Sequence, residues 1–150
     1  MKYFHRIIEQ KRERIALSIT TAEANVVEGE RITAGLIEKQ QGSGSQPHRH
    51  PKVEQFNYVI AGRFKSMVEG EYHTMEVGDM VHIPPNALHQ MVALDEGANI
   101  YFMAKDAASD PELGIMGHAE DKDVDRPWYE PGFDPDEKKL ELSYSCQTYC

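Results

Sequence analysis

Two short stretches of this chain carry histidines in a pattern that decides both its fold and its candidate site. They read PHRHPKVEQ at residues 47–55 and GDMVHIPPNALH at residues 78–89. His48 and His50 are two residues apart, so on an extended strand both side chains point to the same face. A pair of metal ligands on a helix would be four residues apart instead. The spacing therefore indicates a β scaffold that holds a metal ion.

Short segments with strand character surround these two stretches. They are rich in β-branched and aromatic residues and end at Gly, Pro or Asn, which is typical of strands separated by turns. Residues 41–47 have instead the composition of a loop. Closely spaced short strands predict an all-β sandwich or barrel rather than alternating β and α units. The expected strands cover residues 25–30, 31–39, 55–60, 63–68, 72–77, 80–83, 89–93 and 98–104.

The N-terminal part of the chain has a different pattern. Between residues 3 and 17, apolar residues stand among charges with helical spacing. Residues 1–24 are therefore expected to form a short N-terminal helix and arm that leads into a barrel of residues 25–105.

The C-terminal part, residues 106–150, is acidic and interrupted by prolines. Proline blocks long regular structure, so this part is expected to be an irregular extension packed on the barrel. Trp128, Tyr129 and Phe133 are the side chains expected to hold it there.

Composition and charge restrict the class of function. The 150 residues are enough for one domain with its own core. The net charge of −9 argues against nucleic-acid binding and against binding to anionic membranes. There is no apolar run of membrane-spanning length and no apolar region of a secretory signal at the N-terminus, so a cytoplasmic location is expected. Only Cys146 and Cys150 are present, which excludes a disulfide framework.

Together the two stretches resemble the two sequence motifs of the cupin superfamily, over about residues 30–105. The residues that match the first motif are Gly42 or Gly44, His48, His50, Gln55 and Gly62. Those that match the second are Gly78, Pro84 and His89, with Asn86 in place of the usual glycine. The resemblance implies an all-β fold, a double-stranded β-helix or jelly-roll barrel.

The same resemblance implies a metal site with four protein ligands: His48, His50, Gln55 and His89. Glu54 is the alternative to Gln55, and because a strand alternates its faces only one of the two can point into the barrel. Three imidazoles and an amide leave a divalent ion its full charge, whereas a carboxylate would reduce it. Nitrogen and oxygen ligands suit one divalent transition metal, namely Fe, Mn, Ni, Co or Zn.

The cavity beside this site can be predicted from strand alternation. Tyr58, His82 and Tyr101 are the candidates for acid–base catalysis. The expected lining is rather apolar, which is common for small-molecule sites. The lining residues would be Asn57, Val59, Phe64, Met67, Met91 and Met103, with Met75 and Met80 as further candidates.

Three functions are compatible with such a site. The first is a metal-dependent enzyme of the lyase or isomerase type, acting on a small oxygen-rich metabolite. The second is an Fe(II) dioxygenase that cleaves a dicarbonyl or aromatic compound, and the third is a non-enzymatic sensor or ligand-binding barrel. The chain resembles small cupins that open unsaturated uronates, but it has Tyr101, Met103 and Ala107 where those carry an acid, an aromatic residue and an arginine. The family resemblance also implies a homodimer.

Overall fold

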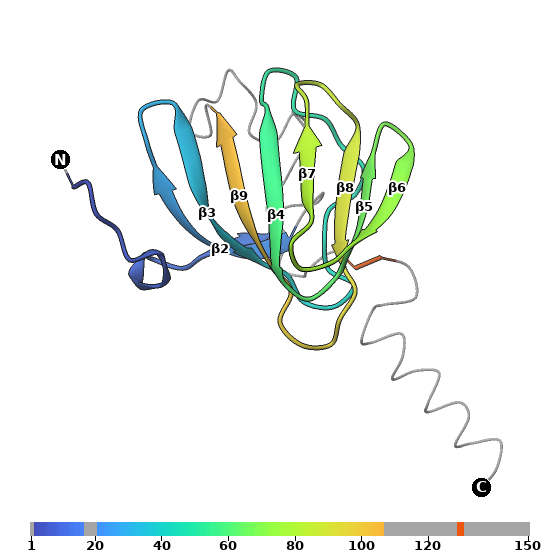
Figure 1. Cartoon of the computed structure of the whole chain (residues 1–150), viewed down its shortest axis with the longest axis horizontal. Helices are drawn as coiled ribbons and strands as arrows, with labels where there is room; N and C mark the ends of the chain where they lie inside the picture. The colour runs from blue at the N-terminus through green and yellow to red at the C-terminus, as the bar shows by residue number, and fades with distance from the viewer. Residues whose placement is uncertain (1, 17–20, 107–128, 131–150) are drawn as a thin grey trace, which may run out of the picture.

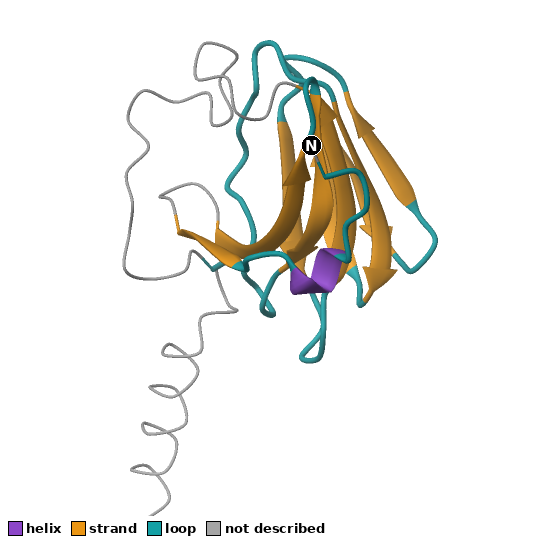
Figure 2. Cartoon of the chain, turned by 90° about the vertical axis from the view of Figure 1, so that its left-hand side faces the viewer, coloured by secondary structure: helices purple, strands orange, loops and turns teal. Residues whose placement is uncertain are grey.

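The computed structural model describes residues 2–16, 21–106 and 129–130, and nearly all of their regular structure is β-strand. No helix among these residues is long and apolar enough to cross a membrane. Figures 1 and 2 show how the strands lie side by side. The elements are η1 (Ile7–Glu9), β1 (Glu13–Ala16), β2 (Thr21–Glu28), β3 (Ile32–Glu38), β4 (Gln55–Ala61), β5 (Phe64–Val68), β6 (Glu71–Met75), β7 (Met80–Ile83), β8 (His89–Ala93) and β9 (Ile100–Asp106).

The strands form two antiparallel sheets whose order differs from their order in the sequence. The larger sheet has the order β1-β2-β3-β9-β4-β7, and the smaller has the order β6-β5-β8. The last strand, β9, lies between β3 and β4 (Figure 1). This placement brings residues from opposite ends of the domain onto one inner face.

The core lies between the two sheets and follows the alternation of the strands. In β4, Gln55, Asn57 and Val59 are buried, whereas the residues between them are exposed. Val59 and Phe64 are fully buried, and the Phe64 ring meets the Tyr101 ring edge-on at a centroid distance of 5.4 Å. Burial of a side chain as large as Phe64 stabilises the fold by about 1.5–3 kcal/mol.

The strands expected between residues 25 and 104 are confirmed, with ends that shift by a few residues. The N-terminal helix is reduced to the single 3₁₀ turn of η1, drawn in purple in Figure 2. Residues 13–16 form β1 instead and pair with β2 in the register Ile15↔Ala22. Sheet pairing and the contact of Ile15 with the core outweigh the weak helical spacing in this segment.

The expected loop at residues 41–47 is in part an irregular strand along β8. The amide of Gly42 donates to the carbonyl of Ala93 at 2.7 Å, and the amide of Ser45 donates to that of Met91 at 3.3 Å. Gly and Ser made this segment look like a loop, but its backbone groups are buried against β8 and need partners there. The pairing continues to His48, so it positions the first histidine of the site.

Of the C-terminal extension, the structure describes Tyr129 and Glu130, and both contact the barrel. Tyr129 forms a β-bridge with Ser43, and its hydroxyl hydrogen-bonds to Gln40 at 3.1 Å. The carboxylate of Glu130 pairs with Lys65. The expected contacts of Trp128 and Phe133, and both cysteines, lie outside the described residues.

Candidate metal centre

Two backbone segments that are far apart in the sequence bring the three motif histidines together. His48 lies opposite His89, the first residue of β8, and each accepts a backbone hydrogen bond from the other, at 2.9 and 3.0 Å. His50 follows two residues after His48, which returns its side chain to the same side. All three residues are buried, with 5–6% of their surface exposed.

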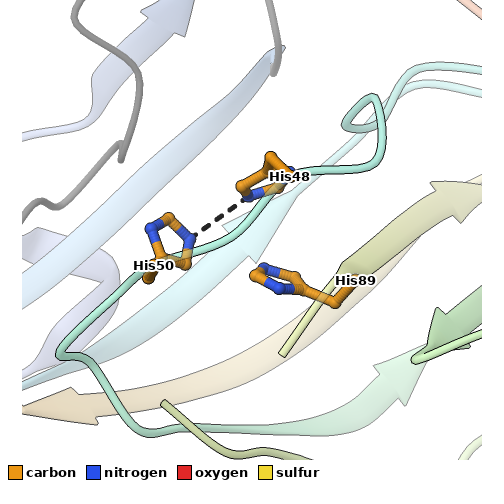
Figure 3. Close-up of side chains that lie close together, drawn as sticks. All are labelled: His48, His50 and His89. Carbon is orange, nitrogen blue, oxygen red and sulfur yellow. Dashed lines mark hydrogen bonds between the residues drawn. The ribbon is translucent and has the colours of Figure 1, made fainter. Parts of the chain in front are cut away.

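The three imidazole rings face a common point, as Figure 3 shows. Their ring centroids are 4.3–5.0 Å apart, and one nitrogen of each ring lies within 4.8 Å of the others. The Nε2 atoms of His48 and His50 are 3.2 Å apart. Two adjacent ligands on a metal with bonds of about 2.1 Å, at a right angle, would be about 3.0 Å apart. The His48 and His50 nitrogens therefore have the spacing of two ligands of one metal ion, and the His89 ring lies close to both.

Backbone carbonyls fix the tautomer of two of the rings. The Nδ1 of His48 donates to the carbonyl of Gln46 at 2.7 Å, and the Nδ1 of His89 donates to that of Ala87 at 2.9 Å. Because a carbonyl oxygen can only accept, the proton must be on Nδ1, and the Nε2 lone pair is left for a metal. Burial lowers the pKa of His89, and its bond to Ala87 only partly opposes this. The ring is thus kept neutral, as a ligand must be.

Gln55 and Glu54 lie on opposite faces of the sheet. Gln55 is buried in the cavity beside the histidines, and its amide nitrogen donates to the Oδ1 of Asn57 at 2.9 Å. The Glu54 carboxylate is exposed and pairs with His82 at 2.7 Å. Of these two neighbours, only Gln55 shares the cavity with the histidine cluster, and its bond to Asn57 leaves the amide oxygen for another partner.

Several motif residues adopt a backbone conformation with positive φ, Asn86 and Gly62 among them. Asn86 has φ +63°, and asparagine is among the few non-glycine residues that tolerate this region. This explains how Asn86 can replace the usual glycine. The backbone N–H of Asn86 donates to the backbone carbonyl of His50 at 2.8 Å, which fixes the backbone at His50. Gly62 has φ +73°, and a Cβ there would lie 2.5 Å from the Asn99 side chain, so this turn requires glycine.

The histidine cluster opens into a cavity of about 290 Å³ between the sheets. Its lining mixes apolar side chains with few polar ones. The lining residues are Ile15, Ala22, Ile37, Lys39, Ser45, His48, His50, Gln55, Asn57, His89, Met91, Tyr101, Met103 and Lys105. A larger outer groove of about 580 Å³, lined by residues such as His73 and His82, does not contain the cluster.

Half of the expected cavity lining is placed there. Asn57, Met91 and Met103 line the cavity, whereas Val59, Phe64 and Met67 do not. Val59 and Phe64 point inward but are fully buried in the apolar core. Met67 is also buried, and its sulfur accepts a hydrogen bond from Gly70. For Val59 and Phe64, alternation predicts the face of the side chain correctly but not its depth in the barrel. Met67 lies on the opposite face from Phe64, because three residues along a strand reverse the face.

Met75 and Met80 are outside the cavity as well. Met75 belongs to the buried core, and Met80 is 60% exposed on the edge strand β7. Met80 pairs with the outward-facing Tyr58 and shares the face of His82, so its side chain lies on the outer face of the sheet.

Two of the three acid–base candidates lie on the outer face of the larger sheet. Tyr58 is 39% exposed, and the exposed His82 ring stacks on Phe56 at a centroid distance of 4.6 Å. Both face away from the cavity because they alternate with inward residues on β4 and β7. The proposals for Tyr58 and His82 as acid–base groups at the histidine cluster are therefore corrected.

Tyr101, the third candidate, lines the cavity. Its side chain is buried, with 6% of the residue exposed, and burial raises the pKa of the phenol. Within the described part of the chain its hydroxyl makes no hydrogen bond. A buried hydroxyl without a partner is unfavourable, so Tyr101 presents a protonated group that a bound molecule can use.

Sequence reasoning missed two lysines in the cavity, Lys39 and Lys105. Burial lowers the pKa of Lys39 to about 7, and its Nζ donates to the carbonyl of Thr21 at 2.8 Å. Burial also lowers the pKa of Lys105. The available signal was strand alternation: Lys39 follows buried Ile37 by two residues, and Lys105 follows buried Met103 by two.

Comparison with known proteins supports the same family. Residues 35–104 match a model of the family described as Cupin domain. The pectin degradation protein KdgF of Dickeya dadantii (strain 3937) is 36% identical over 58 residues, which cover 39% of this chain and 53% of that protein. The matched stretch thus spans about half the length of this curated relative.

Two solved structures share the fold. KdgF from a Halomonas species has 22% identity and a TM-score of 0.64, covering 75% of this chain and 100% of that one. An RmlC-like cupin from Shewanella frigidimarina NCIMB 400 has 21% identity and a TM-score of 0.62, covering 75% of this chain and 97% of that one. The family match includes both histidine stretches, and the fold places their histidines in one cluster. Residues 35–104 of this chain thus match the cupin domain family, and the chain is similar in sequence to the pectin degradation protein KdgF.

Proposed function

We propose that this protein is a metal-dependent enzyme of the lyase or isomerase type that acts on a small oxygen-rich metabolite. The observation that carries the proposal is the convergence of His48, His50 and His89 in the lining of one cavity. Gln55 is the proposed fourth ligand because it is the amide that shares this cavity. The bound ion would be one divalent transition metal: Fe, Mn, Ni, Co or Zn.

The donor set suits a catalytic site better than a closed structural one. Three imidazoles and one amide would leave coordination positions for a substrate in an octahedral ion, and no thiolate belongs to the cluster within the described residues. When bound, such an ion supplies Lewis acidity that polarises a carbonyl or carboxylate oxygen. The backbone carbonyls behind His48 and His89 hold the rings in the orientation that this requires.

The chain's own residues supply the remaining functions. The Tyr101 hydroxyl, buried and protonated, is the proposed proton donor or hydrogen-bond donor to the substrate. Met91 and Met103 line the same cavity with apolar side chains, which disfavour water beside the substrate. Asn57 accepts the amide proton of Gln55, which orients the Gln55 oxygen for a ligand role.

The test starts with elemental analysis of the purified protein and of two matched pairs of variants. His48→Ala is expected to lower metal affinity at least about a hundredfold, because even loss of a supporting group costs up to about that much. His73→Ala, which removes an exposed histidine, should leave the affinity unchanged. Gln55→Ala should weaken binding, whereas Glu54→Ala should not. Equal effects within either pair would refute the assignment of ligands.

The methionines in the cavity favour a second candidate, an Fe(II) dioxygenase acting on a dicarbonyl or aromatic compound, because their apolar side chains suit such substrates. Oxygen uptake by the Fe(II)-loaded protein in the presence of acetylacetone or catechol would support this candidate. Product formation without oxygen uptake supports the lyase or isomerase. Tight ligand binding that survives removal of the metal, without turnover, would instead indicate a non-enzymatic binding protein.

A homodimer remains part of the proposal. The N-terminal arm exposes three large apolar side chains, Tyr3, Phe4 and Ile8, at 77%, 89% and 73%. Several large apolar groups exposed on one short segment favour an interaction surface. Light scattering of the full chain and of a chain without residues 1–10 tests this: a dimer that dissociates on truncation supports the arm as part of the interface. A full-length monomer refutes the dimer.

A further inference from the structure

The cavity beside the histidine cluster carries positive charge in a protein that is strongly acidic. The whole chain has a net charge of −9. The charged side chains among the described lining residues are Lys39 and Lys105, and no Asp or Glu is among them. A small site whose charge opposes that of the whole protein concentrates ligands of the opposite sign, here anions.

Lys105 lies next to the proposed metal ligands. In the antiparallel pairing of β4 with β9, Lys105 is the Cα partner of Gln55, and on its other side it is the partner of Thr33 in β3. Residues 101, 103 and 105 of β9 follow the strand alternation and all three line the cavity. The Lys105 side chain thus lines the cavity on the same face as its strand neighbour Gln55.

The two cavity lysines differ in their partners. Lys39 donates a hydrogen bond to the carbonyl of Thr21, so its ammonium group already has a partner within the protein. Among the described residues, Lys105 has no hydrogen bond and no ion pair. A partly buried cation without a counter-charge is unfavourable. Its ammonium is therefore a group for which a ligand, rather than the protein, would supply the partner.

We propose that Lys105 binds a carboxylate of the substrate, distinct from the oxygen atoms that the metal chelates. This inference rests on the proposed function, because it takes the histidine cluster as the site that holds the other end of the substrate. One ammonium suits a carboxylate; phosphate sites typically use several backbone N–H groups or a helix N-terminus, and no helix lies among the lining segments. The cavity of about 290 Å³ equals the liquid volume of about ten water molecules, so the substrate is a small acid.

The test uses two probes that differ only in the distal group. Malate and 2-hydroxybutyrate can both chelate a metal through the hydroxyl and the adjacent carboxylate, but malate carries a second carboxylate where 2-hydroxybutyrate has a methyl group. Binding to the zinc-loaded protein is measured by titration calorimetry at pH 7. The wild-type protein is expected to bind malate about tenfold or more tightly than 2-hydroxybutyrate, as for a charge-assisted hydrogen bond.

Lys105→Met should abolish this preference and leave the affinity for 2-hydroxybutyrate unchanged, whereas Lys105→Arg should retain part of it. Lys52→Met is the matched control, because it removes the same charge from an exposed residue outside the cavity. Lys105→Gln replaces Lys105→Met if thermal unfolding shows that the latter does not fold.

A wild-type protein that binds malate no better than 2-hydroxybutyrate overturns the inference, and so does a preference that survives in Lys105→Met. An equal loss in Lys52→Met also overturns it, because the effect would then be one of overall charge. Failure of the proposed function looks different: the protein would retain no zinc, and His48→Ala would behave like the wild type.

Discussion

Lys39 offers the sharpest test of the electrostatics of the cavity. Its ammonium group is buried, and burial lowers its pKa from 10.5 to about 7. Above pH 10.5 the group is neutral in both the folded and the unfolded chain. As the pH falls from 10.5 to 7, the unfolded chain takes up a proton and the folded chain does not, so the folded state loses stability. Below pH 7 both states are protonated and the loss stays constant.

The size of this effect follows from the pKa difference. A difference of about 3.5 pH units at about 1.36 kcal/mol each corresponds to about 5 kcal/mol over the whole range. Between pH 7 and pH 10, the free energy of unfolding is expected to increase by about 4 kcal/mol through Lys39. Lys39→Met removes this dependence. It also removes the hydrogen bond to Thr21, which costs about 1 kcal/mol at every pH. The variant should therefore be more stable than the wild type at pH 7 and slightly less stable at pH 10.

Urea unfolding of both proteins at pH 7, 8, 9 and 10 measures this difference. Other groups that titrate in this range lie in both proteins, so their contributions cancel when the two curves are subtracted. The difference curve should have a slope of about 1.4 kcal/mol per pH unit. Parallel curves would show that Lys39 keeps its ordinary pKa, which would contradict the burial of its ammonium group.

Three further outcomes are expected. Metal should be retained at pH 7 and lost as the pH falls below 6.5, because protons then compete with the metal for the histidine nitrogens. The lowered pKa of His89 shifts this loss to lower pH. Full retention of the metal after dialysis at pH 4.5 would contradict the prediction. Asn86→Ala should cost about 1–2 kcal/mol in urea unfolding and Asn86→Gly little, since φ is +63°; equal costs would refute backbone strain as the cause. Tyr101→Phe should stabilise the metal-free protein by about 1 kcal/mol, because it removes a buried hydroxyl. Tyr58→Phe, at an exposed position, should not have this effect. A destabilised Tyr101→Phe variant would mean that the hydroxyl has a partner.

The sequence alone predicted the strands, the resemblance to the cupin family and the set of histidines that meet. β7 and β8 begin and end where expected, because Gly, Pro and Asn mark strand ends locally and alternation is a property of each strand by itself. The faces of Gln55 and Glu54 follow from the same rule, and so does the inward direction of Val59 and Phe64.

Only the tertiary structure decided what depends on pairing between distant segments. Residues 13–16 became a strand and residues 43–48 joined β8 because partner backbones were available there, which local composition does not record. Depth in the barrel separated Met103, which lines the cavity, from Val59, which fills the core. The position of β9 between β3 and β4 placed Lys105 beside Gln55. The alternation of side chains along a strand predicts the face on which each one lies, but not which residues of other strands it contacts. These contacts are therefore determined only when the sheets assemble.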